Sequence, residues 1–192
     1  LSGHAGDGEG GKEGGEGALR EGGENASYSR EFAFSKSTGR PAVLNTKPND
    51  SYTFEGASLL VDGYHSRPVF TSGAWLGYLD EPLDVTIDMG GEQSYRSVEL
   101  ETLAEKGDWI FPPSSVTVWV SDNGTDFTEV ASVAVPEAKA GDADGIGRYR
   151  MQFPETSARY LKVVAQNAAA IPAWHPGAGS KGFLFVDEVV VE

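Results

Sequence analysis

The sequence contains no cysteine, which excludes disulfide bonds and thiolate metal sites. Its only histidines are His4, His65 and His175, and none lies in a pattern typical of a catalytic triad or of a His-Glu-x-x-His zinc site. No Gly-x-Ser-x-Gly nucleophile motif occurs. The many carboxylates do not exclude a glycosidase pair, but no two of them are singled out. We therefore expect a protein that is not itself an enzyme.

Basic residues are also scarce, since 15 Lys and Arg face 29 Asp and Glu, for a net charge of -14. Binding to nucleic acids or to anionic membranes requires a basic surface, so we expect neither partner. No apolar run approaches the ~18–20 residues that cross a bilayer, which excludes membrane insertion by a helix. The chain begins at Leu1 without a signal-peptide pattern, and we interpret it as a fragment of a longer protein.

Residues 1–27 differ in composition from the rest of the chain. Between Gly3 and Gly23 the sequence is dense in glycine and glutamate and has almost no large apolar side chain. Such a segment cannot bury enough surface to offset the entropy lost on ordering. We predict a flexible linker over 1–27 and one folded domain over 28–192.

From Tyr28 onward, apolar and polar residues alternate with a period of two, which is typical of half-buried antiparallel strands. Asn123-Gly124 and Gly90-Gly91 read as turns between strands. No segment of more than a dozen residues has a clear helical period. The pattern predicts an all-β jelly-roll sandwich. The predicted strands cover 31–35, 83–89, 97–103, 115–121, 127–135, 146–153, 159–165 and 183–191.

Three loops rich in glycine and proline each carry one tryptophan. They span 62–78, 105–113 and 171–182, and the tryptophans are Trp75, Trp109 and Trp174. Sugars present C–H faces that stack on aromatic rings, so tryptophans on rigid loops are suited to glycan binding. The alternative is that these side chains fill the ends of the sandwich. Trp75 fits that alternative best, because it runs directly into an apolar strand pattern.

Polar side chains in the same loops could pair with sugar hydroxyl groups. His175 directly follows Trp174, and the first loop carries Tyr64, His65 and Arg67. We take these residues, with Trp109 and Trp174, as candidate ligand-binding residues.

Carboxylates also occur within apolar segments. Asp62 follows a run of apolar residues, and Asp187 and Glu188 interrupt the last predicted strand. If buried, they must be hydrogen-bonded, ion-paired or metal-bound. Hard oxygen ligands of this kind suit calcium. An exposed strand edge or a hydrogen-bonded carboxylate would explain them equally well.

Four segments together resemble the factor 5/8 type C, or discoidin, domains. Residues 58–63 resemble the L-x-D-G opening of that family, and 85–90 resemble its strand ending in D-L-G. Residues 116–124, with Phe127, resemble the V-x-V-x-x-S-x-D-G-x-x-F hairpin. Residues 158–163 resemble the A-R-Y strand. The resemblance covers about residues 30 to 192 in the family's order and implies a galactose-binding-like jelly roll.

A closer likeness is to the C-terminal modules of bacterial family 20 glycoside hydrolases, the β-hexosaminidases. It is carried by residues 109–116, 172–179 and 183–188, where Phe183 stands in place of the tryptophan of that subgroup. Trp109, Trp174 and His175 match the subgroup at their positions.

The resemblance implies a family 32-like carbohydrate-binding module for galactose, N-acetylgalactosamine or N-acetylglucosamine glycans. It also implies a structural calcium ion, for which Asp62 and Glu188 match the side-chain ligands. The Leu59 carbonyl and the Ser66 hydroxyl would complete the coordination, although the loop after Asp62 differs in length from the family pattern.

We therefore expect a monomeric, non-catalytic module that holds a parent glycoside hydrolase on its glycan, in a secreted, periplasmic or cell-surface location. The alternative is a structural module that packs against the parent catalytic domain and binds no sugar.

Overall fold

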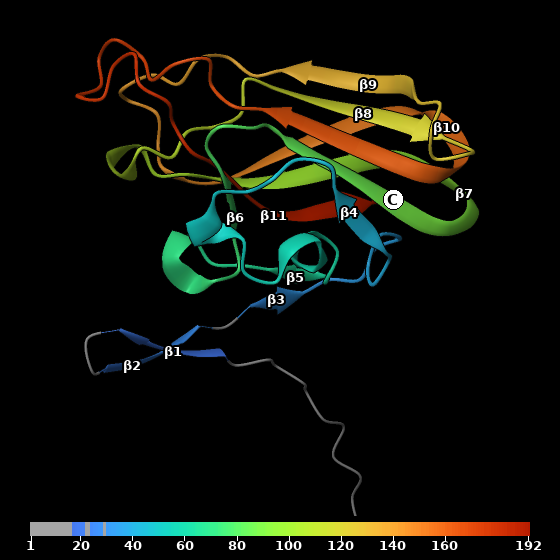
Figure 1. Ribbon diagram of the computed structural model, residues 1–192, viewed down its shortest axis with the longest axis horizontal. Coiled ribbons are helices and arrows are strands. Elements are labelled where there is room, and N and C mark those ends of the chain that lie inside the picture. The colour runs from blue at the N-terminus through green and yellow to red at the C-terminus, as the bar shows by residue number, and fades with distance from the viewer. Residues whose placement is uncertain (1–16, 22–23, 29) are drawn as a thin grey trace, which may run out of the picture.

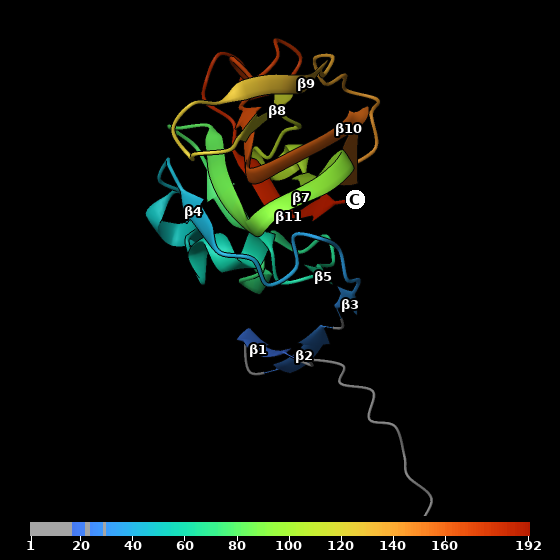
Figure 2. The ribbon, with the colours of Figure 1, turned by 90° about the vertical axis from the view of Figure 1, so that its right-hand side faces the viewer.

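The computed structural model describes residues 17–21, 24–28 and 30–192, and two long strands organise it. Strands β7 (Leu83–Ala104) and β10 (Gly145–Gln166) have 22 residues each and pair antiparallel along nearly their whole length. Both strands bend midway, where the register of the pair shifts between Gln152 and Thr156 and again between Ala158 and Tyr160. Each strand therefore takes part in both layers of a sandwich (Figures 1 and 2).

The remaining strands extend the two layers. The first layer contains the N-terminal half of β7 and the C-terminal half of β10, and the second contains the opposite halves. β4 (Ala42–Leu44), β8 (Ser115–Ser121) and β9 (Thr128–Ala134) complete the first layer. β6 (Leu76–Tyr78) and β11 (Leu184–Val191) complete the second.

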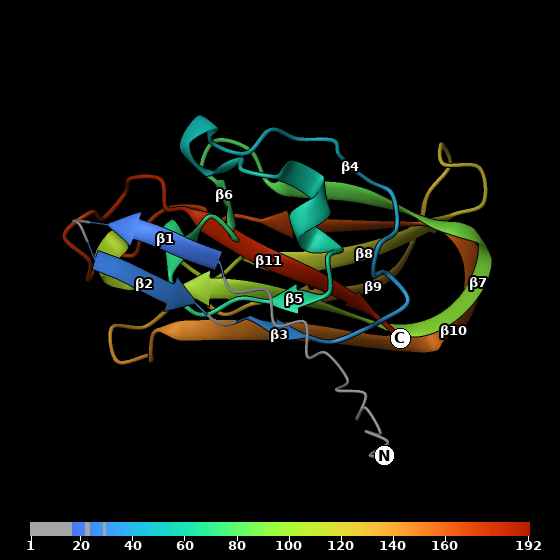
Figure 3. The ribbon, with the colours of Figure 1, turned by 90° about the horizontal axis from the view of Figure 1, so that it is seen from below.

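Short elements cover the second layer (Figure 3). They comprise the paired strands β3 (Glu31–Phe32) and β5 (Tyr64–His65) and the 3₁₀ helices η1 (Asp50–Tyr52), η2 (Gly56–Leu60) and η3 (Phe70–Ser72). A fourth 3₁₀ helix, η4 (Lys106–Asp108), lies in the loop that follows β7.

The segment predicted as a linker is only partly described. Within it, β1 (Gly17–Glu21) and β2 (Glu24–Tyr28) form a separate antiparallel pair, which the composition of the segment did not indicate. Residues 1–16, 22 and 23 lie outside the described part of the chain, so the linker there stays a prediction.

The alternating pattern places its apolar residues in the core, as predicted. Leu83, Val85, Ile87 and Met89 on β7 are fully buried, and Val116 and Val118 on β8 pack against them in the same cluster. Alternate side chains of a strand point to opposite faces, so one layer of core residues follows directly from the period of two. The all-β sandwich predicted from the sequence is confirmed.

Two details of the strand prediction were wrong. The segments 83–89 and 97–103 are parts of one strand, as are 146–153 and 159–165. Gly90 and Gly91 do not make a hairpin turn; with φ of 80° and 142° they bend β7 where it passes between layers. β7 pairs with β10 on both sides of this polar corner, at Asp88 and again at Gln93, and a pattern of side-chain hydropathy does not report backbone pairing.

The hairpin between β8 and β9 is confirmed, with Gly124 at a φ of 76°. The Asn123 side chain shapes it, because its Oδ1 accepts hydrogen bonds from the backbone N–H groups of Thr125 and Asp126. No helix among the described residues is long and apolar enough to span a membrane.

The core predicts a simple stability experiment. Leu100 is fully buried on β7, so Leu100→Ala should lower the free energy of unfolding by about 2–5 kcal/mol through lost burial and a residual cavity. Val43→Ala, at a side chain that is 62% exposed, should change it by less than about 0.5 kcal/mol. Chemical denaturation measures both values, and equal effects of the two substitutions would contradict the assigned core.

Candidate functional site

Two of the predicted tryptophan loops meet at one end of the sandwich. The loop from β7 to β8 carries Trp109, and the loop from β10 to β11 carries Trp174 (Figure 1). Their rings lie 5.9 Å and 5.7 Å from the ring of His175, measured between centroids. Trp109 is 42% exposed and Trp174 is 39% exposed, whereas His175 is buried. The structure therefore brings these three predicted residues together, with the two indoles at the surface.

His175 is committed to holding the loops together. Its Nδ1 accepts the backbone N–H of Gly177 at 2.9 Å, so the ring proton lies on Nε2, which donates to the Lys106 carbonyl at 2.7 Å. Both ring nitrogens are thus used within the protein. His175 joins the two tryptophan loops and has no free polar atom for a ligand, so its predicted role as a sugar contact changes to that of a positioning residue.

The backbone around Trp109 is fixed as well. Trp109 has a left-handed φ of 62°, and its carbonyl accepts the N–H of Phe183 at 2.8 Å. Gly177 lies against the indole, where an added Cβ would come within 2.8 Å of the ring. Gly177 therefore allows the backbone to pack closely against the Trp109 ring.

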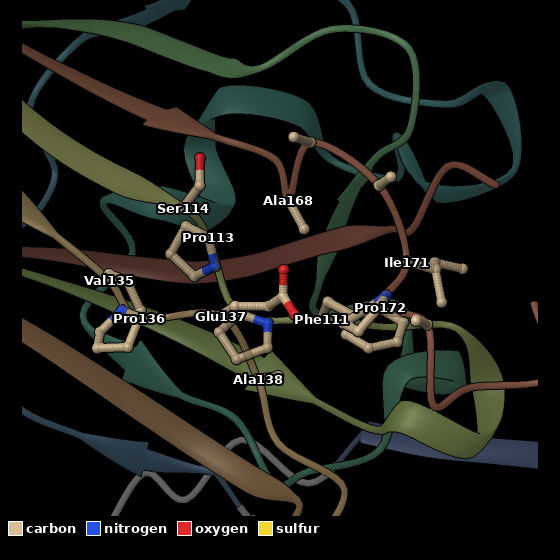
Figure 4. Close-up of a pocket in the computed structure, with 14 residues that line it drawn as sticks. Phe111, Pro113, Ser114, Val135, Pro136, Glu137, Ala138, Ala168, Ile171 and Pro172 are labelled. Carbon is tan, nitrogen blue, oxygen red and sulfur yellow. The ribbon is translucent and has the colours of Figure 1, made fainter. Parts of the chain in front are cut away.

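Trp174 is fixed by its indole nitrogen, which donates to the Ala138 carbonyl at 3.1 Å. Ala138 belongs to the loop between β9 and β10, so three loops contribute to this end of the domain. A groove of about 450 Å³ opens beside Trp174, and Ala138 and Ala173 belong to its lining (Figure 4). No single sequence motif indicated this groove.

Trp75 is a structural residue, as its position before a strand suggested. It is completely buried, and its indole donates to the Arg67 carbonyl at 3.0 Å. The Arg67 side chain is exposed. Among the described residues, no hydrogen bond, ion pair or ring contact joins Tyr64, His65 or Arg67 to Trp109 or Trp174. The candidate binding residues therefore fall into two separate groups.

Tyr64 and His65 belong instead to a network of buried carboxylates. The His65 Nδ1 lies 2.7 Å from Glu101 Oε2, and Arg148 Nε lies 3.3 Å from the same oxygen. The Tyr64 ring contacts Phe32 and lies beneath the Arg30 guanidinium. These contacts attach β3 and β5 to the sandwich, and the period-two pattern gave no sign of them because Glu101 is a charged residue at a buried position.

A bulge in β11 places Asp187 and Glu188 in the interior. The pairing of β11 with β7 shifts register between Val186 and Val189, so both carboxylates are buried although they are consecutive. Asp187 accepts the N–H of Ser66 at 2.6 Å and its hydroxyl at 3.1 Å, and Glu188 accepts the N–H of Gly63 at 2.7 Å. The two carboxylates thereby anchor the loop that begins at Asp62.

Burial dominates the electrostatics of this cluster. Desolvation, with the neighbouring carboxylates, raises the pKa of Asp187 to about 8 and the pKa of Glu188 to about 10. The pKa of Asp62 is also raised by burial, against the lowering effect of its hydrogen bond from Tyr64. One oxygen of Glu188 and one of Glu101 are buried without a hydrogen-bond partner. Near neutral pH and without a cation, Asp187 and Glu188 therefore hold their protons, because ionising either carboxyl group in this buried cluster costs substantial free energy.

The sequence of residues 45–181 matches the family model described as "F5/8 type C domain". This match spans more than half of the chain. The chain belongs to the F5/8 type C domain family.

Solved structures share the fold of this F5/8 type C domain. Chitosan-binding module 2 of a chitosanase/glucanase from Paenibacillus sp. IK-5, in complex with chitotriose, has a TM-score of 0.52 and 19% identity, covering 81% of this chain and 98% of that one. The module CpGH89CBM32-5 from Clostridium perfringens, in complex with GalNAc-β-1,3-galactose, has a TM-score of 0.51 and 16% identity, covering 79% and 93%.

A GH29 fucosidase from Ruminococcus gnavus has a TM-score of 0.50 and 10% identity, covering 82% of this chain but only 26% of the enzyme. No curated protein is significantly similar in sequence. These likenesses show the fold of the F5/8 type C domain.

The oxygen ligands that the sequence suggested for calcium fit that ion in part in this F5/8 type C domain. Glu188 has an unpartnered buried oxygen, and the closest cation to the Asp62 carboxylate is Arg30, at 3.7 Å. Ser66 fits less well, because its hydroxyl donates to Asp187, and Leu59, buried in η2, could offer only its carbonyl. No three acidic or histidine side chains among the described residues are arranged to hold a metal, so backbone carbonyls and water would have to complete the shell.

The raised pKa values predict how stability depends on pH without calcium. The unfolded chain releases the protons of Asp187 and Glu188 near the ordinary values of 3.8 and 4.5, whereas the folded domain holds them up to about 8 and about 10. The folded state binds more protons in this window, so the free energy of unfolding should fall as the pH rises from about 5 to 8.

Denaturation in the presence of a chelator measures this slope. Asp187→Asn and Glu188→Gln should each make it shallower, whereas Glu155→Gln, at an exposed side chain, should leave it unchanged. Asp62, Glu101, His65 and Arg30 face the same cluster and are retained in all variants. An unchanged slope in both core variants would show that these carboxyl groups do not titrate abnormally.

Proposed function

We propose that this F5/8 type C domain is a non-catalytic carbohydrate-binding module that holds a parent glycoside hydrolase on glycans of the galactose, N-acetylgalactosamine or N-acetylglucosamine type. The observation that carries the proposal is the pair of exposed indoles, Trp109 and Trp174, held on loops that His175 and backbone hydrogen bonds make rigid. Exposed aromatic rings of fixed orientation are suited to stacking on sugar rings.

The structural likenesses support this proposal without defining the ligand. Domains of the same fold are named as binding chitotriose and GalNAc-β-1,3-galactose, and one such region forms about a quarter of a fucosidase. We propose a β-hexosaminidase of family 20 as the parent enzyme, on the strength of the residues at 109–116, 172–179 and 183–188. A secreted, periplasmic or cell-surface location, and a monomeric state, belong to the same proposal.

Glycan binding can be tested by calorimetric titration with galactose, N-acetylgalactosamine, N-acetylglucosamine and chitobiose. We expect saturable, sub-millimolar binding to at least one of them, because a shallow exposed site buries little area. Trp174→Ala should weaken it about tenfold, because a stacking partner is lost.

Phe34→Ala is the matched control, since Phe34 is 79% exposed and lies on the segment after β3, outside the loops that carry Trp109 and Trp174. The Phe34→Ala variant should bind the sugar with the same affinity as the original domain. If a folded domain binds none of these sugars, the module is instead one that packs against its parent catalytic domain.

Calcium is part of the proposed function as a structural ion. We propose that Asp62 and Glu188 hold it with backbone carbonyls, where it would supply positive charge to the orphaned oxygen of Glu188. Ser66 and the Leu59 carbonyl remain proposed ligands of lesser fit.

Calcium should therefore raise the melting temperature of the domain, because an ion that binds only the folded state at 100 times its Kd adds about 2.7 kcal/mol of stability. Glu188→Gln should abolish the response, and Glu155→Gln should retain it. Equal melting temperatures of the original domain in calcium and in chelator would refute the calcium site.

A further inference from the structure

The groove beside Trp174 has a size and an apolar lining that stacking of a sugar on the two exposed indole rings does not require. Its volume is about 450 Å³, within the range typical of ligand pockets. Nearly all of its lining is small or rigid and apolar (Figure 4). The apolar lining residues are Phe111, Pro112, Pro113, Val135, Pro136, Ala138, Ala168, Ala169, Ala170, Ile171, Pro172 and Ala173.

Glu137 is the one ionisable residue in this lining. Figure 4 shows its carboxylate pointing toward the middle of the groove, among the proline rings. In the part of the chain that the structure describes, Glu137 makes no hydrogen bond and no ion pair, so its oxygens are available to a donor on a ligand. The groove thus presents one strong acceptor against apolar walls.

The position of Trp174 connects the groove to the proposed sugar surface. Trp174 follows Ala173, which lines the groove, and its indole nitrogen is bonded to Ala138, the neighbour of Glu137. Since the indole N–H is already satisfied, the exposed part of Trp174 offers a ring surface rather than a donor. A sugar that stacks on this ring can direct a substituent into the groove.

We propose that the groove receives the 2-acetamido group of a sugar stacked on Trp174, an inference that rests on the proposed carbohydrate-binding function. The amide N–H donates to Glu137, and the methyl group packs against the proline and alanine walls. A plain hydroxyl group would leave the apolar walls without a partner. An ammonium group would use the carboxylate but would be poorly matched to those walls.

The test compares three matched probes by NMR titration of the whole domain: the methyl β-glycosides of N-acetylglucosamine, glucose and glucosamine. The N-acetylated glycoside should bind best, by about tenfold over the other two, and should shift the indole N–H resonance of Trp174. Glu137→Ala should remove this advantage, because a hydrogen bond to a charged group is lost. Glu129→Ala, at an exposed carboxylate on β9 outside the groove, should preserve it.

A second pair of variants tests the apolar walls. Ala170→Leu places a larger side chain at an exposed position in the groove lining and should reduce binding of the N-acetylated glycoside selectively. Ala140→Leu, at an exposed position outside the lining, should have no such effect. Both positions are exposed, so both variants should fold, which melting curves confirm.

Three outcomes would overturn the inference. Equal binding of glucose and N-acetylglucosamine glycosides refutes acetamido recognition and leaves the proposed function intact. Preference for the glucosamine glycoside, lost in high salt and in Glu137→Gln, identifies the groove as a site for a cationic sugar instead. Absence of binding to every sugar, galactose and N-acetylgalactosamine included, refutes the proposed function together with the inference.

Discussion

The antiparallel pairing of β7 with β10 determines where every loop of the candidate site emerges. Ala104 pairs with Gly145, and Gln166 pairs with Ser115, which itself pairs with Ala134. The loops 105–114, 135–144 and 167–183 therefore begin and end at the same edge of the sandwich. Because both strands cross from one layer to the other, a single register brings together the loops that carry Trp109 and Trp174, which are 65 positions apart in the sequence.

In the carboxylate cluster on the second layer, an unfavourable burial of carboxyl groups is set against favourable hydrogen bonds. Burial of the Asp187 and Glu188 carboxyl groups lowers the stability of the folded domain. The same groups accept hydrogen bonds from backbone N–H groups of the loop that follows Asp62. Gly63 has a φ of 77°, and a Cβ there would come within 2.7 Å of the Phe32 ring, so this loop has little freedom to rearrange. The hydrogen bonds that the two carboxyl groups accept from Gly63 and Ser66 explain why they can persist at consecutive buried positions, and the calcium ion that we propose would offset their charge once they ionise.

Most of the core could be predicted from the sequence, because alternation decides which face of a strand is buried. Ile87 and Val118 lie where the period of two places them. Continuity of the long strands could not be predicted: the polar residues around Gly90 resemble a turn, and only the pairing partner shows that the strand goes on. The bulge that buries both Asp187 and Glu188 breaks the alternation itself, so no pattern rule finds it.

The candidate site was predictable to a lesser degree. The glycine-rich and proline-rich composition of their loops pointed to Trp109 and Trp174, and the structure places both at the surface, whereas Trp75 in a similar loop is buried. The role of His175 was not readable, because residue type does not reveal whether both ring nitrogens are already bonded. The groove was missed for a similar reason: prolines and alanines read as loop residues in a sequence, and only three converging loops make a cavity of them.

The rigidity of these loops has a consequence for recognition. A shallow sugar site gains little affinity from buried area. Its affinity therefore depends on how little conformational entropy the loops lose when the sugar binds. His175 bonds one tryptophan loop to the other, Trp174 is bonded to a third, and Gly177 lies flat against Trp109. These bonds fix both rings before any ligand arrives.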